Sequence, residues 1–390
     1  MRYAFVTSEF PTIYSNKGGL ATYTRRMARL LTESGYDVDV FVLGDGTPDH
    51  YVQESYKVHH VPFRGQSRLN KIRKFFAMFG CERYAARWHY RSAAMAMASA
   101  IESIHAKQPF DVVQSPDHFG LGSALKKVSG RLHVVRCSAA MELYMSSDGR
   151  RSAVADEQVL IEVKAVSSAD LVIAPSTLVA SYYKKKLARD VHVVRPPAYL
   201  EESPSNPPYW LPEKFLVHFA SWLGHRKGSD LIAKALPEAI ATAPDLTMLW
   251  FGSVPDGPAG DVVRGVSVKH VLRVDTIDKS TLFAILKKAT AVVIPSQVDN
   301  LPNTLIECLL LNVPLIVSDG ASQNECVSEG PGVRLVPLGD SKALAKAMID
   351  GWNGDLGHPV DPWISTSHGV AFRPEEALRN HLEVIRNHVV

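Results

Sequence analysis

Short runs of hydrophobic residues, each bounded by turn-forming residues, recur along the chain. Runs of this length and composition predict β-strands that are buried on both faces, as in parallel sheets. The first half holds such runs at residues 2–8, 37–43, 111–116, 132–138, 170–176 and 191–197. The second half repeats the pattern at residues 214–221, 246–253, 269–274, 290–296, 313–319 and 332–338.

Longer amphipathic stretches separate these runs, for example at residues 21–35 and 227–242. Strands that alternate with helices predict βαβ units, in which a parallel sheet is covered by helices on both faces. The pattern therefore predicts an α/β protein built from doubly wound, Rossmann-like domains.

A proline-rich segment interrupts the alternation between residues 195 and 213. It holds six prolines and little periodicity, which is typical of a linker between domains. We therefore predict an N-terminal domain at residues 1–197, a linker at 198–212 and a C-terminal domain at 213–372. Ligands of doubly wound folds bind outside the carboxyl ends of the strands, so we expect a ligand in the cleft between the two domains.

The composition is that of an ordinary globular protein, with 46% hydrophobic and 21% charged residues. The net charge of +3 gives no overall bias towards nucleic acid. The four cysteines are widely spaced and form neither a zinc pattern nor a disulfide framework, which favours a reducing compartment. No apolar run approaches the ~18 residues of a membrane span, and a strand begins at once without a signal sequence, so we expect a cytoplasmic protein.

Residues 64–91 depart from this even balance of charge. They carry eight Lys or Arg against one Glu, with six aromatic residues among them. A basic helical stretch with aromatic residues is suited to an anionic membrane surface or a lipid-linked acceptor, which would place the protein at the inner face of the membrane. The alternative is a solvated helix whose aromatic residues belong to the core.

Two short polar motifs follow predicted strands. Gly18 and Gly19 open a helix whose N–H groups suit a phosphate, and a simple turn cap is the alternative. No G-x-G-x-x-G sequence occurs, which counts against a nicotinamide enzyme. Arg226 and Lys227, before Gly228, are two cations suited to a diphosphate, and an exposed basic loop is the alternative.

A third motif, "VDNLPNTLIECLLLNVPLIVSDG" at residues 298–320, joins a polar loop to an apolar helix. Pro302 suits the first turn of that helix, and Asn303 and Thr304 offer their N–H groups to a ligand. Glu307 lies one turn further on the same face, inside the apolar run. Because a buried carboxylate needs partners, we expect paired sugar hydroxyls there. A polar stripe on an amphipathic helix is the alternative.

Together these motifs resemble those of the retaining GT-B glycosyltransferases of family four, the group 1 glycosyl transferases. The hallmark of that family is a pair of acidic residues separated by seven others, here Asp299 and Glu307, followed by the small-residue, Pro and Asp pattern of residues 312–327. "GGLATYTRRMARLLTESGYDVDVF" and "RKGSDLI" extend the resemblance over nearly the whole chain. It implies a GT-B fold, with two Rossmann-like domains facing each other across a cleft and a last helix, at about residues 373–390, packing back on the N-terminal domain.

The resemblance also implies roles for individual residues. Glu307 would accept hydrogen bonds from the ribose of a nucleotide sugar, and Asp299 would hold hydroxyls of the donor sugar. Lys227 would bind the diphosphate, as would the Gly19 loop. The other residues implied for this donor site, the last two near the base, are Gly18, Arg226, Asn300, Leu301, Pro302, Asn303, Thr304, Arg273 and Val274.

The chain departs from the family pattern around the donor. Asp299 stands where Glu is usual, and is one methylene shorter. Trp222 and Ser221 stand where the family usually has an Arg before the Lys-Gly pair, and Arg226 is the candidate to replace its charge.

Ser138 stands where the family usually has a His that contacts the donor sugar. His118, which follows the preceding strand, is the candidate to replace it, and a structural role is the equal alternative. The catalytic residues that we expect are Lys227, Asp299, Glu307 and His118. The acceptor-side residues that we expect are Asp117, His118, Arg136 and Ser138.

Asp37 and Asp39 form a D-x-D sequence, which binds a metal in other glycosyltransferases. Here they alternate with valines in a predicted central strand, and no other metal-binding residue clusters with them in the sequence. We predict no metal site, because lysine, arginine and helix amides would neutralise the leaving diphosphate.

The resemblance thus implies an enzyme that moves a hexose from a nucleoside diphosphate sugar to a hydroxyl of a glycan or lipid-linked acceptor, with retention and without a required cofactor. UDP-hexose is the commonest donor in such enzymes, and polysaccharide or glycoconjugate assembly is the expected setting. The alternatives are a GT-B sugar-nucleotide epimerase or phosphorylase, and a non-catalytic protein that binds nucleotide sugars.

Overall fold

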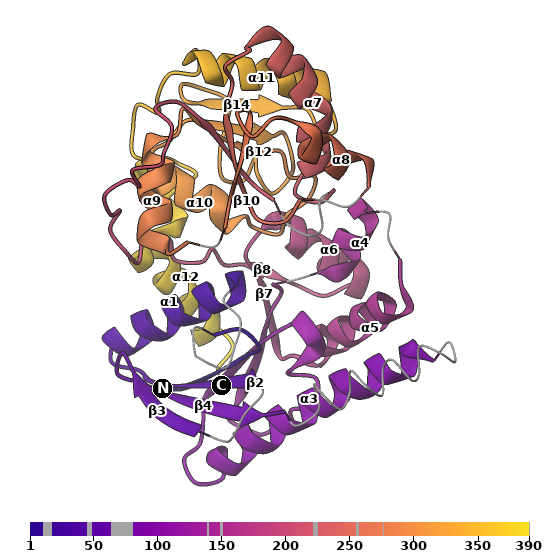
Figure 1. Cartoon of the computed structure of the whole chain (residues 1–390). Helices are drawn as coiled ribbons and strands as arrows, with labels where there is room; N and C mark the ends of the chain where they lie inside the picture. Colours follow the sequence, from indigo (N-terminus) through magenta and orange to yellow (C-terminus); the bar gives the residue numbers. More distant parts are fainter. Residues whose placement is uncertain are drawn as a thin grey trace. The chain divides into compact units, whose positions relative to one another are not determined.

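The computed structural model describes residues 1–10, 18–44, 49–63, 81–138, 140–148, 151–220, 225–254, 257–275 and 277–389. The chain forms two compact units. Unit 1 comprises Met1–Pro197 and Pro374–Val390, and unit 2 comprises Ala198–Arg373. Each unit is an α/β structure with a mainly parallel sheet and helices on both of its faces (Figure 1).

The sheet of unit 1 has the strand order β3-β4-β2-β1-β5-β6-β7-β8. Its strands are β1 (Arg2–Thr7), β2 (Asp37–Gly44), β3 (Asp49–Gln53), β4 (Tyr56–Pro62), β5 (Val112–Pro116), β6 (Leu132–Arg136), β7 (Leu171–Ala174) and β8 (His192–Val193). Its helices are α1 (Gly19–Glu33), α3 (Glu82–His105), α4 (Met141–Asp148), α5 (Ala153–Ser168), α6 (Thr177–Leu187) and α12 (Pro374–Arg386). A 3-10 turn, η1 (His118–Gly120), follows β5.

Alternating side chains of β1 divide the core of unit 1 into two layers. Tyr3 packs in one layer with Met27 of α1 and Ile385 of α12. Ala4 packs in the opposite layer with Met97 of α3. Since α12 supplies Ile385 to the first layer, the last helix of the chain completes unit 1 although it follows unit 2 in the sequence.

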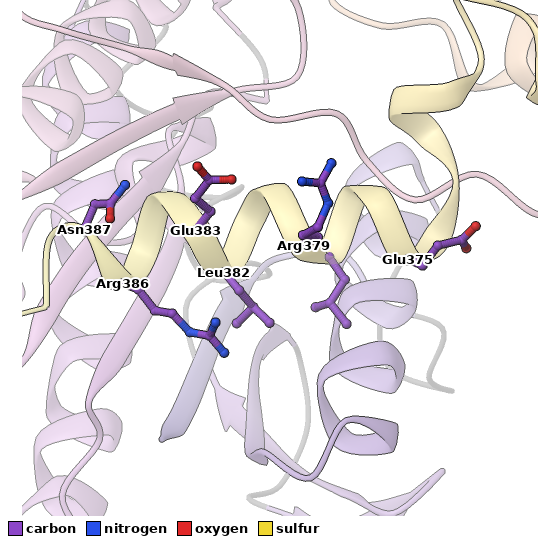
Figure 2. A pocket seen from close by; sticks show the side chains of 7 residues that line it. Glu375, Arg379, Leu382, Glu383, Arg386 and Asn387 are labelled. Atoms are coloured by element: carbon purple, nitrogen blue, oxygen red, sulfur yellow. The ribbon is translucent and has the colours of Figure 1, made fainter.

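The other face of α12 is polar. Figure 2 shows its charged side chains, which alternate in sign along the helix and, with Leu378 and Leu382, line a surface pocket. Arg386 also donates a hydrogen bond to the hydroxyl of Tyr36 (3.0 Å). The helix is therefore amphipathic, with its apolar side chains directed into unit 1.

The sheet of unit 2 has the strand order β11-β10-β9-β12-β13-β14. Its strands are β9 (Leu216–Phe219), β10 (Met248–Phe251), β11 (Val271–Val274), β12 (Ala291–Ile294), β13 (Leu315–Ser318) and β14 (Val333–Val336). Its helices are α7 (Ser229–Thr242), α8 (Pro258–Gly265), α9 (Lys279–Lys288), α10 (Asn303–Leu310) and α11 (Ser341–Asn353), with 3-10 turns η2 (Trp363–Ser365) and η3 (Val370–Phe372).

Unit 2 also has two core layers, one on each face of its sheet. Val292 of β12 packs with Leu305 of α10 in one layer. Val293, the next residue, packs with Ile232 of α7 and Leu344 of α11 in the other. This burial on both faces explains why the strands are continuously apolar.

The strands predicted from the hydrophobic runs are all present, as β1, β2 and β5 to β14. The hairpin of β3 and β4 was not predicted. Its turn residues, Glu54 and Ser55, have left-handed backbones (φ 47° and 72°), a conformation usually signalled by Gly or Asn. The sequence therefore carries no recognisable turn signal at this hairpin.

The segment predicted as a linker is grouped with unit 2. Ala198 is buried in a core layer of that unit, and its N–H donates to the carbonyl of Phe372 (2.8 Å). The division between the units falls at Pro197. In the described ranges we find no helix with the length and apolar character needed to cross a membrane.

Candidate functional site

The loops that follow β9 and β12 meet at the carboxyl edge of the unit 2 sheet, because these strands are parallel neighbours. Gly228 has a left-handed backbone (φ 71°), and a Cβ atom there would lie 2.0 Å from the carbonyl oxygen of Pro295. The N–H of Gln297 donates to the carbonyl of Arg226 (2.9 Å). Glycine permits this close approach, which holds Arg226 and Lys227 against the loop after β12.

Asp299 binds both cations at this junction. The carboxylate is buried, and Lys227 Nζ donates to its two oxygens at 3.0 and 2.8 Å. Arg226 Nη1 donates to Asp299 Oδ1 at 3.2 Å. Charge-assisted hydrogen bonds of this kind fix the orientation of the carboxylate. Sequence reasoning selected all three residues, and the structure brings them into direct contact.

Helix α10 begins immediately after this loop. Pro302 has an extended backbone and precedes the first turn, in which Asn303 and Thr304 present their N–H groups. The first turn contains no acidic residue, so the positive end of the helix is free of a negative charge from its own sequence. Asn300 is buried, and Leu301 packs on the apolar core, which anchors the loop.

Glu307 is also buried, with an 8% exposed side chain, and Lys279 Nζ donates to its Oε1 at 2.6 Å. Lys279 is the first residue of α9 and is half-exposed. The carboxylate in the apolar helix thus has a cationic partner. Sequence reasoning missed Lys279, although a lysine in the first turn of a helix is a signal, because the helix dipole disfavours a cation there.

Ser296 and Gln323 are two further residues of this edge that sequence reasoning missed. Gln323 Nε2 donates to the carbonyl of Ser296 at 3.0 Å. The hydroxyl of Ser296 is buried and has no hydrogen-bond partner among the described atoms. A buried hydroxyl of this kind is normally satisfied by a ligand or an ordered water. Nothing in the sequence distinguishes this serine from an ordinary strand end.

Arg273 and Val274, expected near the base, lie at the sheet edge in β11, which β10 separates from β9. Arg273 is exposed, and Val274 packs on the apolar core. The structure therefore places these two residues apart from Asp299. Lys279 begins the next helix along the chain and reaches Glu307 from this side of the unit.

In unit 1, the Gly18 loop holds an internal carboxylate. Backbone N–H groups of Leu20 and Ala21, in the first turn of α1, donate to Glu9. A Cβ atom at Gly18 would lie 2.2 Å from Glu9 Oε2, so glycine makes room for this carboxylate. Burial raises the pKa of Glu9. An anion does occupy the helix start where a phosphate was expected, and it belongs to the protein.

Asp117 is fully buried and organises the loops after β5 and β6. Its carboxylate accepts hydrogen bonds from the N–H groups of His118 (2.9 Å), Ser138 (2.6 Å) and Ala140 (3.1 Å). It also accepts one from the hydroxyl of Tyr183 (3.0 Å). With so many internal donors, the carboxylate of Asp117 positions the two loops, and its contact with an acceptor stays a prediction.

Arg136 lies at the end of β6 and is buried. Its guanidinium carbon lies 3.6 Å from the ring centroid of Tyr23, and Nη1 donates to the hydroxyl of Ser138 at 2.6 Å. Burial lowers the pKa of Arg136, an effect opposed by Tyr23 and Asp117. Arg136 and Ser138 therefore form a fixed polar pair at the carboxyl edge of this sheet.

His118 packs against Phe119, with ring centroids 3.9 Å apart, and its Nδ1 lies 3.4 Å from Gln158 Nε2. Burial lowers the pKa of His118, and the charge of Asp117 opposes this shift. Phe119 has a left-handed backbone (φ 56°), a strained conformation for a large side chain. The expected acceptor-side residues thus gather where two loops of unit 1 meet.

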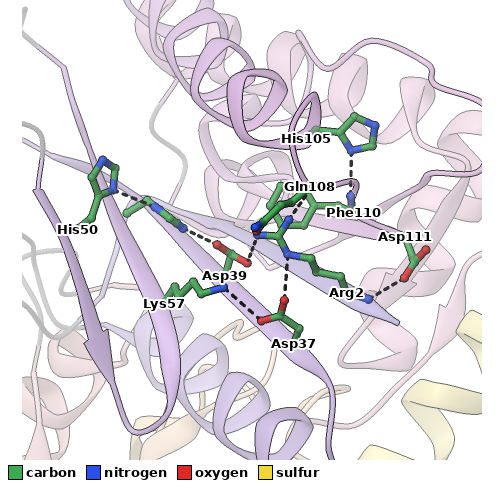
Figure 3. Close-up of polar contacts among 10 residues, drawn as sticks. Arg2, Asp37, Asp39, His50, Lys57, His105, Gln108, Phe110 and Asp111 are labelled. Atoms are coloured by element: carbon green, nitrogen blue, oxygen red, sulfur yellow. Dashed lines mark hydrogen bonds and ion pairs between the residues drawn. The ribbon is translucent and has the colours of Figure 1, made fainter.

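The D-x-D sequence is a structural pair of β2 (Figure 3). Arg2 Nη2 donates to Asp39 Oδ2 at 2.8 Å, and Arg2 Nε lies 3.2 Å from Asp37 Oδ2. His59 Nε2 lies 2.5 Å from Asp39 Oδ1. Burial of Asp39 raises its pKa, but the contacts with His59 and Arg2 outweigh burial and lower it. No group of three His, Cys, Asp or Glu side chains that could hold a metal occurs in the described part of the chain.

Two protein-family models match the chain. Residues 18–198 match the glycosyl transferase 4-like domain. Residues 213–353 match glycosyl transferases group 1. The second match contains the residues gathered at the carboxyl edge of the unit 2 sheet.

Two similar curated proteins are mannosyltransferases. The lipopolysaccharide core biosynthesis mannosyltransferase of Rhizobium leguminosarum bv. viciae is 24% identical over 177 residues, which are 44% of this chain and 46% of that protein. The phosphatidyl-myo-inositol mannosyltransferase of Mycobacterium leprae is 26% identical over 125 residues, which are 32% of this chain and 33% of that protein. Each match thus spans less than half of the curated relative.

Solved structures resemble the chain over its whole length. Sucrose-phosphate synthase from Thermosynechococcus elongatus has a TM-score of 0.72 at 18% identity, with 99% of this chain and 98% of that chain covered. HepE from Anabaena, solved with UDP-glucose, has a TM-score of 0.67 at 15% identity, with 99% and 100% covered. At these identities the similarity concerns the fold.

Proposed function

Since the chain has the GT-B fold and matches glycosyl transferase domains in both units, we propose that it is a glycosyltransferase that moves a hexose from a nucleoside diphosphate sugar to a hydroxyl. The mannosyltransferase relatives support a hexose, and their names support a glycan or lipid-linked acceptor. UDP-glucose in the HepE structure supports a nucleoside diphosphate donor, so UDP-hexoses are the first donors to test.

One observation carries this proposal. Two buried carboxylates lie on one polar loop and helix start. Asp299 is bound by Arg226 and Lys227, and Glu307 is bound by Lys279. Sugar and ribose hydroxyls are donors suited to carboxylates, and a diphosphate is suited to Arg226, Lys227 and the first N–H groups of α10. A nucleoside diphosphate sugar contains all of these groups within one molecule.

Binding of the donor would rearrange the ion pairs of the site. The diphosphate takes Arg226 and Lys227 from Asp299, and this carboxylate is then free to accept hydroxyls of the sugar. Glu307 accepts from the ribose. The exchange replaces one anion by another at the same two cations, so neither cation is left buried without a counter-charge.

In the reaction, an acceptor oxygen forms a bond to the anomeric carbon while the bond from that carbon to the diphosphate breaks. The nucleoside diphosphate leaves with the electron pair, and a phosphate oxygen takes the proton of the acceptor hydroxyl. Attack from the face that the leaving group departs retains the anomeric configuration. Arg226, Lys227 and the helix amides stabilise the leaving charge, so the mechanism calls on no metal.

The acceptor is assigned to unit 1. Arg136, Ser138 and His118 are held at the ends of β5 and β6 by internal contacts, and Asp117 fixes the backbone that carries them. Such a preorganised edge suits an acceptor hydroxyl that must be held in one orientation. Gly18 and Gly19 would admit a donor phosphate only after Glu9 leaves the start of α1.

A thermal-shift series tests the donor proposal. A nucleotide sugar that binds the folded chain raises its melting temperature, with a stabilisation of about 2.7 kcal/mol at a hundredfold excess over Kd. UDP-glucose, GDP-mannose and ADP-glucose are compared, and transfer is then assayed with the donor that binds. Lys227→Ala should reduce turnover at least about a hundredfold, the loss typical of a donor that stabilises the leaving charge. Glu307→Gln, which removes the charged acceptor for the ribose hydroxyls, should weaken binding of the donor.

Lys288→Ala, at the exposed end of α9, is the matched control and should retain full turnover. A chain that binds no nucleotide sugar, or Lys227→Ala with unchanged turnover, would sink the assignment. Binding without transfer or hydrolysis would instead identify a non-catalytic nucleotide-sugar-binding protein.

We also assign a membrane contact to the basic, aromatic segment at residues 64–91, of which residues 64–80 lie outside the described ranges. In α3, Tyr84, Trp88 and Met95 are 64%, 55% and 65% exposed, and their spacing places them along one side of the helix. Arg91 is exposed beside them. An exposed aromatic and basic face is suited to an anionic lipid surface, where a lipid-linked acceptor resides.

Co-sedimentation with vesicles tests this contact. The chain should bind vesicles that contain phosphatidylglycerol and not vesicles of phosphatidylcholine alone, and high salt should release it. Replacing Tyr84 and Trp88 by Ser should reduce binding, whereas Val268→Ser, an exposed apolar residue of unit 2, should not. Equal binding by all three proteins would remove the membrane assignment and leave the donor site untouched.

A further inference from the structure

Lys279 is the cation of the donor site whose role is not yet explained. Its ammonium donates to Glu307 Oε1 at 2.6 Å, and it lies 5.6 Å from the ring centroid of Phe283. The side chain is 49% exposed, whereas that of Glu307 is 8% exposed. The lysine thus reaches from solvent to a carboxylate that is nearly closed off from water.

The backbone of Lys279 is held rigidly by its neighbour. The carboxylate of Asp278 caps α9, accepting from the N–H of Thr281 (2.8 Å), its hydroxyl (2.7 Å) and the hydroxyl of Ser280 (2.6 Å). These hydrogen bonds lower the pKa of Asp278 and keep the cap ionised. The backbone of Lys279 is therefore fixed at the start of α9, and its side chain extends from there to Glu307.

The stability of α9 does not account for a lysine at this position. A cation in the first turn opposes the helix dipole, and acidic residues are favoured there. The preference is reversed at Lys279, and its ammonium is directed to a buried carboxylate on another helix. Residues that contradict a local rule in this way are expected at functional sites.

The charge of Lys279 has a consequence for an anionic ligand. Arg226 and Lys227, which the diphosphate would bind, form ion pairs with Asp299, whereas Glu307 has Lys279 as its ion-pair partner in the described part of the chain. Without the lysine, the carboxylate of Glu307 would repel a diphosphate bound at the start of the same helix, α10. When Lys279 is present, its positive charge cancels the negative charge of the Glu307 carboxylate, and the repulsion is removed.

We propose that Lys279 is a positioning residue that makes the site selective for ribonucleoside diphosphates. It fixes Oε1 of Glu307, which orients the remaining acceptor positions of the carboxylate towards the ribose hydroxyls, and it cancels the charge that would repel the diphosphate. The inference rests on the proposed donor site. It adds a residue of α9 to the donor-site residues in the loops after β9 and β12 and in α10. It also defines the ligand class by the 2′-hydroxyl.

The test is calorimetric binding of UDP and GDP and of their 2′-deoxy forms, without any acceptor. Lys279→Met should weaken binding of the ribonucleotide about tenfold, a factor appropriate to a half-exposed hydrogen bond between charged groups. The preference for ribose over 2′-deoxyribose should fall in the same variant. Lys279→Arg should retain most of the affinity, and turnover at saturating donor should change little.

Lys288→Met, with the same loss of charge on the same helix, is the matched control and should bind like the unmodified chain. If Lys279 only clamps α9 to α10, Lys279→Met lowers the melting temperature and leaves affinity and ribose preference unchanged, which would overturn the inference. If the unmodified chain binds neither ribonucleotide, the donor site itself is wrongly assigned, and the proposed function fails with it.

Discussion

Gly228 allows a close approach to Pro295 that helps to determine where two cations lie. The missing Cβ leaves room for the carbonyl of Pro295, and the left-handed backbone turns Arg226 and Lys227 towards Asp299. An alanine would carry both a backbone penalty of about 1 kcal/mol or more and a collision with a carbonyl that has no freedom to retreat.

Gly228→Ala should therefore lower the free energy of unfolding by about 2 kcal/mol or more, from backbone strain and overpacking together. It should also abolish the thermal shift caused by a nucleotide sugar, because Lys227 is displaced. Gly265→Ala, at the end of α8 with no atom within 4 Å of the added Cβ, is the control and should be neutral or slightly stabilising. Equal melting temperatures for the two variants would contradict the packing argument.

At this scale, the residues found from the sequence are those whose role follows from spacing along one segment. Asp299 and Glu307 share a loop and a helix, and Lys227 precedes a Gly after a strand, so the spacing together with the family resemblance selects them. Lys279 and Glu9 act through contacts with distant segments, Glu307 and the start of α1. Such contacts are created by folding, so the local sequence does not identify the partner, although a lysine in the first turn of α9 is itself unusual.

At the scale of elements, α12 contributes a buried histidine to the core of unit 1. His381 is 1% exposed, and neither of its ring nitrogens has a hydrogen-bond partner among the described atoms. Burial, with a smaller contribution from the charge of Arg136, lowers its pKa from 6.5 to about 4. The ring therefore stays neutral in the folded protein over the physiological range.

Acid should loosen this helix. Since the unfolded chain binds a proton near pH 6.5 and the folded chain only near 4, stability is present above pH 6.5 and is lost as the pH falls towards 4. At 1.36 kcal/mol per pKa unit the loss is about 3 kcal/mol. Urea unfolding between pH 7 and pH 4.5 should show a weaker pH dependence for His381→Leu than for the unmodified chain.

His358→Leu, at an exposed position of unit 2, should leave that pH dependence unchanged. His133 and His218, whose pKa values burial also lowers to about 4, remain in both variants and keep part of the acid sensitivity. If the free energy of unfolding of His381→Leu depends on pH as steeply as that of the unmodified chain, His381 does not contribute to the acid sensitivity.

The elements that the sequence predicted are those buried on both faces, because such strands are continuously apolar. β3 is partly exposed and β4 carries His59 and His60, so neither forms an apolar run. Their turn also lacks Gly and Asn. This hairpin lies at a sheet edge and is stabilised by tertiary contacts such as that of His59 with Asp39. The hydrophobic pattern of the sequence therefore does not predict it.

At the scale of the whole molecule, the repeated strand–helix pattern predicts doubly wound α/β domains, and the resemblance to group 1 glycosyl transferases implies that they form a GT-B fold. The similarity to solved structures over 99% of the chain confirms this fold. The proline-rich segment marks the neighbourhood of the division between units, yet it packs in unit 2. Prolines indicate where regular secondary structure ends, but they do not indicate which hydrophobic core the following residues pack against.

The hydrogen bond between Ala198 and Phe372 joins the first residues of unit 2 to its last ones. Unit 2 is therefore a single long loop inserted into unit 1, whose own sequence resumes only at α12. Closing a flexible loop of that length costs about 4 to 5 kcal/mol of chain entropy. If unit 2 folds first, the hydrogen-bonded ends of unit 2 close this loop before unit 1 folds. Folding of unit 1 then requires no further loss of loop entropy, and α12 already lies near the core that it completes.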